Sequence, residues 1–440
     1  MVKMLKVSEI VKLLSGLLKI DTTNPPGNET EAAKYLSEWL AERGIRSEII
    51  ECDKNRGNLI ARIRGTNEGP SLLLLSHLDV VPADPSRWRV HPFSGAIKDE
   101  YVWGRGALDM KSMVALETYI FAELSSMNKQ PKGDIILAAT AGEERGGIGV
   151  QWLLNNARNK ILADYVINEG GGDGIQTKNG WLFSIQVAEK GVFWHKIRTK
   201  GAPAHGSIPT LGINAIEKMN LILSRLLSFK PKIELTEQSK KYIETLLKME
   251  GLLEDNLTED NLDLLLNKLA EKDKGLSEYL RAMTRITMAP TVIRGGVKEN
   301  VIPHECELTI DCRVTPGHTS SSIKKIIQDL YSGLEYEFEF IHEAEPTWSP
   351  INTPLFGILE NSIKKHIPNA QVAPHMITGG TDSRYFRTLG IPAYGFQPLM
   401  IEGSYSEWAK LIHGDNERIS IRNLEFGYKV LSDAIKTFMY

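Results

Sequence analysis

The chain has 440 residues, with 52 lysines and arginines against 55 aspartates and glutamates, a formal net charge of −3 and 42% hydrophobic residues. This length exceeds one ordinary core, so we expect two or three domains, and the near-neutral balance without long single-sign blocks argues against nucleic-acid binding. The three cysteines form no C-x-x-C pair, which argues against a disulfide framework and a thiolate metal site. Since no apolar run approaches the ~20 residues of a membrane span, we expect a soluble, cytoplasmic protein.

The first part of the chain alternates helical and strand patterns. Apolar residues recur at helical spacing over residues 7–20 and 30–43, on either side of an NPPGN loop at 24–28. Further segments follow in turn, with strands predicted at 47–51, 58–64, 71–76, 135–141 and 165–167 and helices at 112–127 and 147–157. Strands that alternate with helices predict an α/β sheet with helices on both faces.

The pattern changes after Gly191. Alternating strands and amphipathic helices predict an α+β module, with strands at 193–199, 291–294, 307–314 and 336–343 and helices at 214–227 and 320–332. A Leu-rich, charge-rich stretch at 233–283 has helical periodicity and no strand signal, and the α/β style returns after residue 350. We therefore predict a mixed-sheet domain over 1–189 and 347–440, with a second domain inserted at 190–346.

Histidine and acidic side chains follow the predicted strands. The strand at 71–76 leads to His77 and Asp79, which point to one face of an extended segment and suit a metal ligand oriented by a carboxylate. Alone, an H-x-D pair is more often a hydrogen-bonded strand end. The loop GRGALDMK at 104–111 has Asp109 where a dinucleotide fingerprint would have its third glycine. By itself, that aspartate would be read equally well as a helix cap.

Three more strand ends or loops carry such groups. Glu143 and Glu144 follow the strand at 135–141, and because neighbours cannot face one point, one suits a metal and the other a base. Glu169 follows the next strand, and His413 stands near the C-terminus; each alone would be an ordinary turn or structural residue. Jointly, two histidines and three carboxylates are the ligand types of a two-zinc hydrolytic site with one bridging carboxylate. The set is His77, Asp109, Glu144, Glu169 and His413.

In this order the motifs resemble the co-catalytic di-zinc family of aminoacylases, acetylornithine deacetylases, succinyl-diaminopimelate desuccinylases, glutamate carboxypeptidases and related dipeptidases. The resemblance runs from TNPPGNE at 23–29 through SHLDVVP at 76–82 and WGRGALDMK at 103–111 to His413. It implies that His77 and Glu169 hold one metal, that Glu144 and His413 hold the other, and that Asp109 bridges both. It also implies that Glu143 is the general base, that Asp79 orients His77, and that the Asp109–Met110 peptide is cis.

The resemblance also assigns the inserted domain as a lid and dimerisation domain. Its GAPAHGS motif at 201–207 matches the one whose histidine reaches the scissile carbonyl from the neighbouring subunit, so His205 is expected to stabilise an oxyanion. Asn300 and Arg313 match residues that grasp a substrate carboxylate, and Gly380 and Thr381 lie in a substrate-facing loop. The stretch at 233–283 exceeds the compact lid, and the sequence leaves open whether it shapes the pocket, extends the dimer or packs.

We therefore predict a homodimeric amidohydrolase with two Zn²⁺ per subunit, or Co²⁺ or Mn²⁺ in their place. It would hydrolyse N-acyl amino acids, in the manner of acetylornithine deacetylase or succinyl-diaminopimelate desuccinylase, through a metal-bridging water and a glutamate base. The alternatives are a carboxypeptidase or dipeptidase with the same metals, a phosphoesterase, and a metal-dependent binding protein without turnover. Partners are small molecules or short peptides, with no nucleic acid and no membrane.

Overall fold

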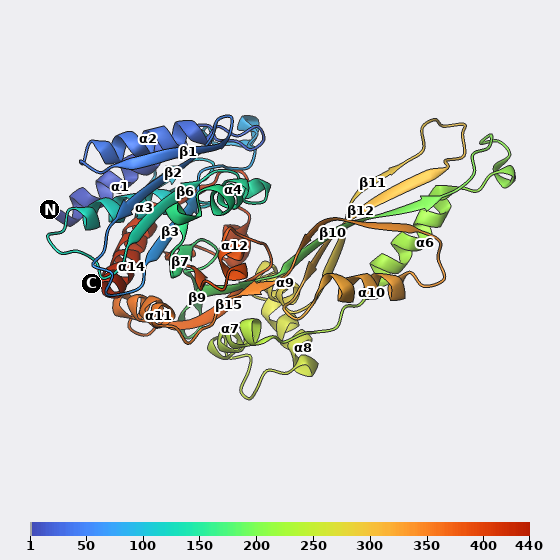
Figure 1. Ribbon diagram of the computed structural model, residues 1–440. Helices are drawn as coiled ribbons and strands as arrows, with labels where there is room; N and C mark the ends of the chain where they lie inside the picture. The colour runs from blue at the N-terminus through green and yellow to red at the C-terminus, as the bar shows by residue number, and fades with distance from the viewer. Residues whose placement is uncertain (1) are drawn as a thin grey trace.

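The computed structural model describes residues 2–440, which form a broad α/β body and an elongated arm (Figure 1). The body is built on an eleven-stranded mixed sheet. Its strands follow the order β1 (Ser47–Asp53), β2 (Arg56–Ile63), β6 (Ile135–Thr140), β3 (Leu72–His77), β7 (Tyr165–Asn168), β16 (Ala393–Gly395), β9 (Gly180–Glu189), β8 (Asp173–Thr177) and β17 (Leu399–Met400), with β14 (Thr347–Trp348) and β15 (Gln371–Ile377) also on β9.

The centre of this sheet is parallel: β3 pairs in parallel with both β6 and β7, and β16 pairs in parallel with β7. The outer strands β1, β2 and β8 pair antiparallel with their neighbours. In β3, Leu72 and Leu74 face one hydrophobic cluster and Leu73 and Leu75 face another. A strand covered on both faces needs a continuous apolar run, which is what the sequence has at this position.

Helices cover both faces of the sheet, as predicted. One face carries α1 (Val2–Leu18), α2 (Glu29–Ala41), α3 (Lys111–Ser125), α11 (Pro354–His366) and α14 (Ile421–Met439). The other carries α4 (Ile148–Asn156), α5 (Arg158–Ile161) and α12 (Ser383–Thr388). A small sheet of β18 (Arg418–Ser420), β5 (Tyr101–Trp103) and β4 (Ile97–Lys98) completes the body, with the short helix α13 (Tyr405–Ala409) nearby in sequence.

The arm is an antiparallel four-stranded sheet with two helices. Its strand order is β11 (Thr287–Gly295), β12 (Glu305–Val314), β10 (Gly191–Lys200) and β13 (Glu337–Ala344). The helices α6 (Ala215–Ser228) and α10 (Ser320–Leu330) pack on it around a separate hydrophobic cluster. The molecule is thus an α/β catalytic body with an inserted α+β domain, as the sequence predicts.

The stretch at 233–283 is helical, as its periodicity predicts. It forms α7 (Glu237–Met249), α8 (Glu259–Ala270) and α9 (Lys274–Met283), and we call these three helices with their connections the helical insertion. Its buried side chains, among them Tyr242, Leu246 and Leu280, belong to the hydrophobic cluster of the body and not to that of the arm. The helical insertion therefore lies within the inserted length of chain but packs on the body, with α7 against β15 and β9.

No helix among residues 2–440 combines the length and the hydrophobicity that a bilayer crossing requires.

Candidate metal centre

Three neighbouring parallel strands end at one edge of the body sheet. His77 is the last residue of β3, Glu143 and Glu144 follow β6 after a short turn, and Glu169 follows β7. Ligand sites in such sheets form beyond the carboxyl ends of the strands. The turn after β6 requires a glycine: Gly142 has φ +74°, and a Cβ at that position would lie 2.2 Å from Ile148. The predicted strand-end residues are therefore brought together by the sheet itself.

The loop that carries Asp109 is held from within the body by Glu417. The carboxylate of this fully buried residue accepts hydrogen bonds from the backbone N–H groups of Gly106, Leu108 and Asp109 at 2.7–3.0 Å. It also pairs with the buried guanidinium of Arg105 at 2.8 Å. The Asp109–Met110 peptide is cis, as expected from the resemblance. The loop is thereby fixed with its aspartate at the strand ends.

His413 reaches the same place from the loop after α13. Its backbone lies in the left-handed region, with φ 58°, and its carbonyl oxygen accepts a hydrogen bond from Arg105 at 3.2 Å. Arg105 thus contacts both Glu417 and the backbone of His413, and connects the two loops that supply Asp109 and His413.

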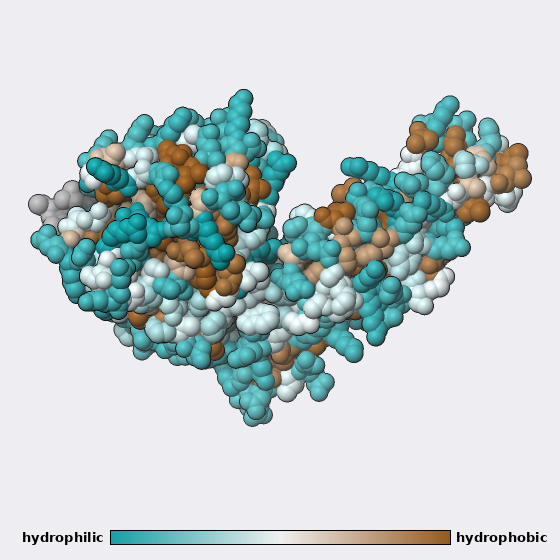
Figure 2. Space-filling model, in the orientation of Figure 1, coloured by the Kyte–Doolittle hydropathy of each residue, from teal (hydrophilic) through white to brown (hydrophobic). Residues whose placement is uncertain are grey.

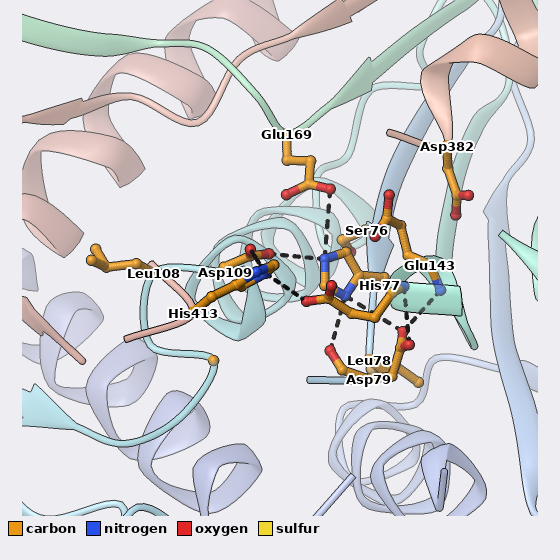
Figure 3. A network of polar contacts seen from close by, with 12 residues as sticks. Ser76, His77, Leu78, Asp79, Leu108, Asp109, Glu143, Glu169, Asp382 and His413 are labelled. Atoms are coloured by element: carbon orange, nitrogen blue, oxygen red, sulfur yellow. Dashed lines mark hydrogen bonds and ion pairs between the residues drawn. The ribbon is translucent and has the colours of Figure 1, made fainter. Parts of the chain in front are cut away.

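The five side chains form two groups that share Asp109 (Figure 3). In the first, Nε2 of His77 lies 3.0 Å from Oδ1 of Asp109 and 3.5 Å from Oε1 of Glu169. In the second, Nε2 of His413 lies 3.0 Å from Oδ2 of Asp109 and 3.1 Å from Oε1 of Glu144. Within each group all candidate ligand atoms lie within 4.8 Å of one another. Asp109 directs one oxygen to each group, which is the arrangement that a bridging carboxylate requires.

The charges of these groups suit a cation. Burial alone would lower the pKa of His77, but the carboxylates of Glu169 and Asp109 outweigh it and hold that pKa well above its usual value. Hydrogen bonds to Asp109 and Glu144 raise the pKa of His413 to about 10. Burial and the charge of Asp109 raise the pKa of Glu169 to about 7. Three half-buried carboxylates around two imidazoles form a donor set of hard oxygen and borderline nitrogen ligands, which fits Zn²⁺ and related divalent ions.

Asp79 lies beneath the centre and is fully buried. Nδ1 of His77 lies 3.0 Å from its backbone oxygen and 3.6 Å from its carboxylate. The carboxylate oxygens accept hydrogen bonds from the amide of Asn24 at 2.7 Å and from the backbone N–H groups of Glu143 and Glu144 at 3.0 and 3.2 Å. The carboxylate therefore fixes the turn that carries both glutamates, in addition to its contact with the histidine.

Glu143 lines two cavities that meet at the metal centre. Burial and the charge of Glu169 raise the pKa of its carboxyl well above the usual range. Gly380 and Thr381 line both cavities as well, and Arg313 lines the one between the body and the arm. Arg313 is held by a two-point contact with Asp311, at 2.7 and 3.1 Å.

His205 and Asn300 lie elsewhere in the same chain. The backbone N–H of Gly206 donates to the carbonyl oxygen of Asn300 at 2.8 Å, and a bridge joins His205 to Val301. These loops sit at the end of the arm that points away from the body (Figure 1), and neither residue lines the two cavities at the centre. One chain thus brings together the five candidate ligands, Asp79, Glu143, Arg313, Gly380 and Thr381, but not His205 or Asn300.

Several residues that shape the centre were not assigned a role from the sequence, although Asn24 lies in the TNPPGNE motif. Glu417 and Asn24 act through hydrogen bonds to distant loops, and Asp382 accepts a hydrogen bond from Thr140 at 3.3 Å behind Glu143. Burial raises the pKa of Asp382 to about 7. Glu417 lies four residues after His413. This closeness in sequence to a candidate ligand is the signal that could have pointed to Glu417.

Comparison with known proteins agrees with this geometry. The family model of peptidase family M20/M25/M40 matches residues 73–437. The chain belongs to this family. It is therefore an enzyme of the metallopeptidase and amidohydrolase class, a hydrolase with a candidate dinuclear metal centre.

The similar proteins act on several kinds of amide. The chain is 27% identical over 385 residues to a probable succinyl-diaminopimelate desuccinylase of Staphylococcus aureus. The matched region covers 86% of this chain and 86% of that one. It is 29% identical over 452 residues to the human N-fatty-acyl-amino acid synthase/hydrolase, covering 96% of this chain and 86% of that one. Among solved structures, the M20 family metallo-carboxypeptidase Sso-CP2 of Sulfolobus solfataricus has the same fold, with a TM-score of 0.73 at 22% identity, covering 98% of this chain and 99% of that one.

Proposed function

We propose that this M20 enzyme hydrolyses the amide bond of N-acyl amino acids with two divalent metal ions and Glu143 as general base. The observation that carries the proposal is the pair of ligand groups that share the two oxygens of Asp109, with Glu143 beside them in both cavities. His77 and Glu169 would hold one ion, and Glu144 and His413 the other. We propose zinc as the native metal, with Co²⁺ and Mn²⁺ as substitutes, because nitrogen and carboxylate ligands accept all three.

The metal ions and the side chains of the chain would have different roles in the reaction. Two bound cations would supply Lewis acidity, which polarises a carbonyl group and lowers the pKa of water. Glu143 takes a proton from the water that attacks the acyl carbonyl carbon and then gives it to the nitrogen of the departing amino acid. Its raised pKa favours this, because a more basic carboxylate takes a proton from water more readily and holds it until the amine departs. Asp79 keeps Glu143 in place through the backbone of the turn.

The amino-acid part of the substrate would lie in the cavity between the body and the arm. Three guanidinium groups line this cavity, those of Arg145, Arg313 and Arg384, and none of its lining groups is a lysine. A guanidinium presents paired donors that match a carboxylate. We therefore propose that Arg313, with Gly380 and Thr381 on the opposite wall, holds the carboxylate of an N-acyl amino acid. The relatives that act on succinyl-diaminopimelate and on N-fatty-acyl amino acids have substrates with such a carboxylate.

We further propose that two copies of the chain share their centres. His205 and Asn300 lie at the end of the arm, so they would complete the centre of a partner subunit, where His205 would donate to the developing oxyanion. Apolar side chains are exposed near this end, and Figure 2 shows brown residues gathered there. They include Leu211, 74% exposed, Ile213, 52% exposed, and Val297, 85% exposed. Exposed apolar patches of this kind mark protein interfaces. We place the dimer in the cytoplasm, because all three cysteines are free thiols.

The test is a substrate panel with the purified protein loaded with Zn²⁺, Co²⁺ or Mn²⁺. We expect turnover of N-acyl amino acids, loss of turnover on removal of metal by a chelator, and weaker or no turnover of dipeptides and phosphoesters. Glu143→Gln should lower kcat by at least about a hundredfold, since general-base catalysis contributes that much. Metal content measured by mass spectrometry should be unchanged in this variant. The exposed Glu254→Gln is the matched control, with wild-type turnover.

Two results would contradict the proposal. Wild-type turnover in a Glu143→Gln protein that holds both metals would remove the base assignment. Faster hydrolysis of dipeptides than of every N-acyl amino acid would make the protein a dipeptidase with the same metals.

A further inference from the structure

A second cavity adjoins the metal centre on the side opposite the arginine-lined one. It has a volume of about 400 Å³, within the usual range of small-molecule sites, and Asp109, Glu144 and His413 form its inner end. Leu108, which lies beside Asp109 and His413 in Figure 3, belongs to the same wall. We call this cavity the inner pocket.

The helical insertion contributes two aromatic side chains to the inner pocket. Tyr242 of α7 and Tyr279 of α9 line it together with His375 of β15 and with Tyr405 and Trp408 of α13. These rings form a continuous series: the centroids lie 4.6 Å apart for Tyr242 and His375, 5.7 Å for His375 and Tyr279, 5.2 Å for Tyr279 and Tyr405, and 5.6 Å for Tyr405 and Trp408. The rings are tilted against one another and form a largely apolar wall.

Hydrogen bonds hold part of this wall in place, while Nδ1 of His375 and Nε1 of Trp408 are buried without a hydrogen-bond partner. The hydroxyl of Tyr279 lies 3.1 Å from Nε2 of His375, and burial lowers the pKa of His375 to about 3, so the imidazole is neutral. Ser406 of α13 contacts Asp273, the residue before α9, and accepts a hydrogen bond from the backbone N–H of Gly275 at 2.8 Å. The wall therefore stands without a ligand and offers aromatic and aliphatic surface to the interior.

The inner pocket lacks a partner for an anionic group. Among the described residues that line it there is no lysine and no arginine, and its two histidines are the neutral His375 and the candidate ligand His413. Asp173 lines it as well, and its carboxyl accepts a hydrogen bond from Ser184 at 2.6 Å. A succinyl carboxylate that lies among the aromatic rings would meet an acidic side chain and no lysine or arginine, so the loss of its hydration would not be offset by a cationic side chain.

The two cavities determine the orientation in which a substrate would bind. Both contain Glu143, Glu144 and Thr381, so a carbonyl carbon at the metal centre has the arginine-lined cavity on one side and the inner pocket on the other. In an N-acyl amino acid, the carboxylate lies on the nitrogen side of the scissile bond and the acyl chain on the carbon side. The carboxylate matches the guanidinium groups, which leaves the acyl chain for the aromatic pocket.

We propose that the helical insertion makes the inner pocket an acyl site for long alkyl or aromatic groups, so that the enzyme prefers bulky apolar N-acyl amino acids to acetyl and succinyl ones. This inference rests on the proposed function for the orientation of the substrate. Each methylene that leaves water for the pocket should raise kcat/KM about fourfold until the pocket is full.

The first test compares a series of N-acyl alanines, from acetyl through butanoyl, hexanoyl and octanoyl to decanoyl, with benzoyl and succinyl alanine beside them. We expect kcat/KM to rise along the alkyl series and to be lowest for succinyl. Ala409→Phe, which places a ring in the pocket from α13, should remove the preference for long chains by lowering the decanoyl to acetyl ratio at least about tenfold. Ala270→Phe makes the same change on α8 outside the pocket and should keep the wild-type ratio.

The second test does not depend on turnover. Calorimetric titration of the zinc-loaded protein with decanoate, acetate and succinate should show the tightest binding for decanoate, weakened in Ala409→Phe and unchanged in Ala270→Phe. If no N-acyl amino acid is turned over but decanoate binds in this way, the acyl pocket stands and the proposed function fails. If acetyl or succinyl alanine is the best substrate and decanoate binds no more tightly than acetate, the pocket assignment is overturned while the hydrolase assignment stands.

Discussion

Glu117 is a fully buried carboxyl group on α3, outside the metal centre. Burial raises its pKa from the model-compound value of 4.5 to about 8. The folded protein therefore keeps a proton that the unfolded chain loses above pH 4.5. The contribution of this carboxyl group to the free energy of unfolding is therefore fully present below pH 4.5. It falls by about 1.4 kcal/mol for each pH unit between 4.5 and about 8.

Glu117→Gln should remove this loss, because a neutral amide of the same shape carries no ionisation cost. We expect the variant to unfold at nearly the wild-type temperature at pH 5 and at a clearly higher temperature at pH 8. Thermal unfolding followed by circular dichroism at both pH values measures this difference. Glu254→Gln, at an exposed position, should follow the wild type at both pH values. An equal shift at pH 5 and pH 8 would show that Glu117 is already ionised in the folded protein.

The residues of the metal centre differ in how far sequence predicts their position. His77, Glu144 and Glu169 stand at the ends of apolar parallel strands, and because such strands end at one edge, the meeting of these three could be predicted. Glu417 could not, since it contacts the Asp109 loop across 308 positions of sequence and only the folded chain brings them together. The carboxylate of Asp79 was expected at His77, and its hydrogen bonds to the turn of Glu143 and Glu144 depend on the pairing of β3 with β6.

Helices and strands in which apolar residues recur with a regular spacing were the easiest to predict. Strands in which polar residues or proline interrupt that spacing were missed. β8, β9 and β15 occur where no strand is predicted from sequence. β15 contains Pro374, which is unusual inside a sheet, yet it pairs in parallel with β9 along its length. In β9 the polar Ser184 and Gln186 are fully buried. Their hydrogen-bond partners, Asp173 and Glu189 among them, become available only in the folded sheet.

Polar contacts join the helical insertion to α13 in addition to its apolar packing on the body. Asp273 caps α9 by accepting from the backbone N–H of Leu276 at 3.1 Å, and it accepts from the backbone N–H of Ser406 at 3.2 Å. Asp273→Ala should lower the free energy of unfolding by about 1–2 kcal/mol, which is the cost of a lost N-cap with a further hydrogen bond.

Hydrogen exchange read by mass spectrometry should also show faster exchange in α9 and α13 of the Asp273→Ala protein, with β3 and β6 unaffected. Asp255→Ala, at an exposed position of the same insertion, is the control and should exchange like the wild type. Faster exchange throughout the body would mean that Asp273 supports the whole fold and not this contact.

At the scale of the whole molecule, the proposed dimer with shared centres predicts complementation between inactive subunits. His205→Ala should lack the oxyanion donor and Glu143→Gln the base, so each homodimer should be nearly inactive. When the two proteins are unfolded and refolded together in equal amounts, half of the dimers should be mixed, and each mixed dimer has one intact centre. Activity should therefore return to about a quarter of the wild-type value.

The oligomeric state provides the accompanying measurement. Light scattering should give the mass of a dimer for the wild type. Ile293→Lys, on the exposed edge strand β11 where the side chain is 54% exposed, should shift the protein towards a monomer that still binds metal. A monomeric wild type with full turnover, or an inactive mixture after refolding, would show that each chain works with its own residues alone.

The docking of the helical insertion on the body changes how the two parts of the molecule are connected. The chain passes between body and arm at residue 190, at 229–236, at 284–286 and at 345–346, because α7 to α9 return to the body in the middle of the inserted domain. Lys190 ties the first of these crossings to the third, donating to the carbonyl oxygens of Ala282 and Arg285 at 2.9 and 2.7 Å. An arm joined by two strands could swing about a single hinge. An arm joined at four points, two of them connected through Lys190, is held in one direction, so in the proposed dimer the distance from one centre to the partner's arm would be set by the fold of each chain before the two associate.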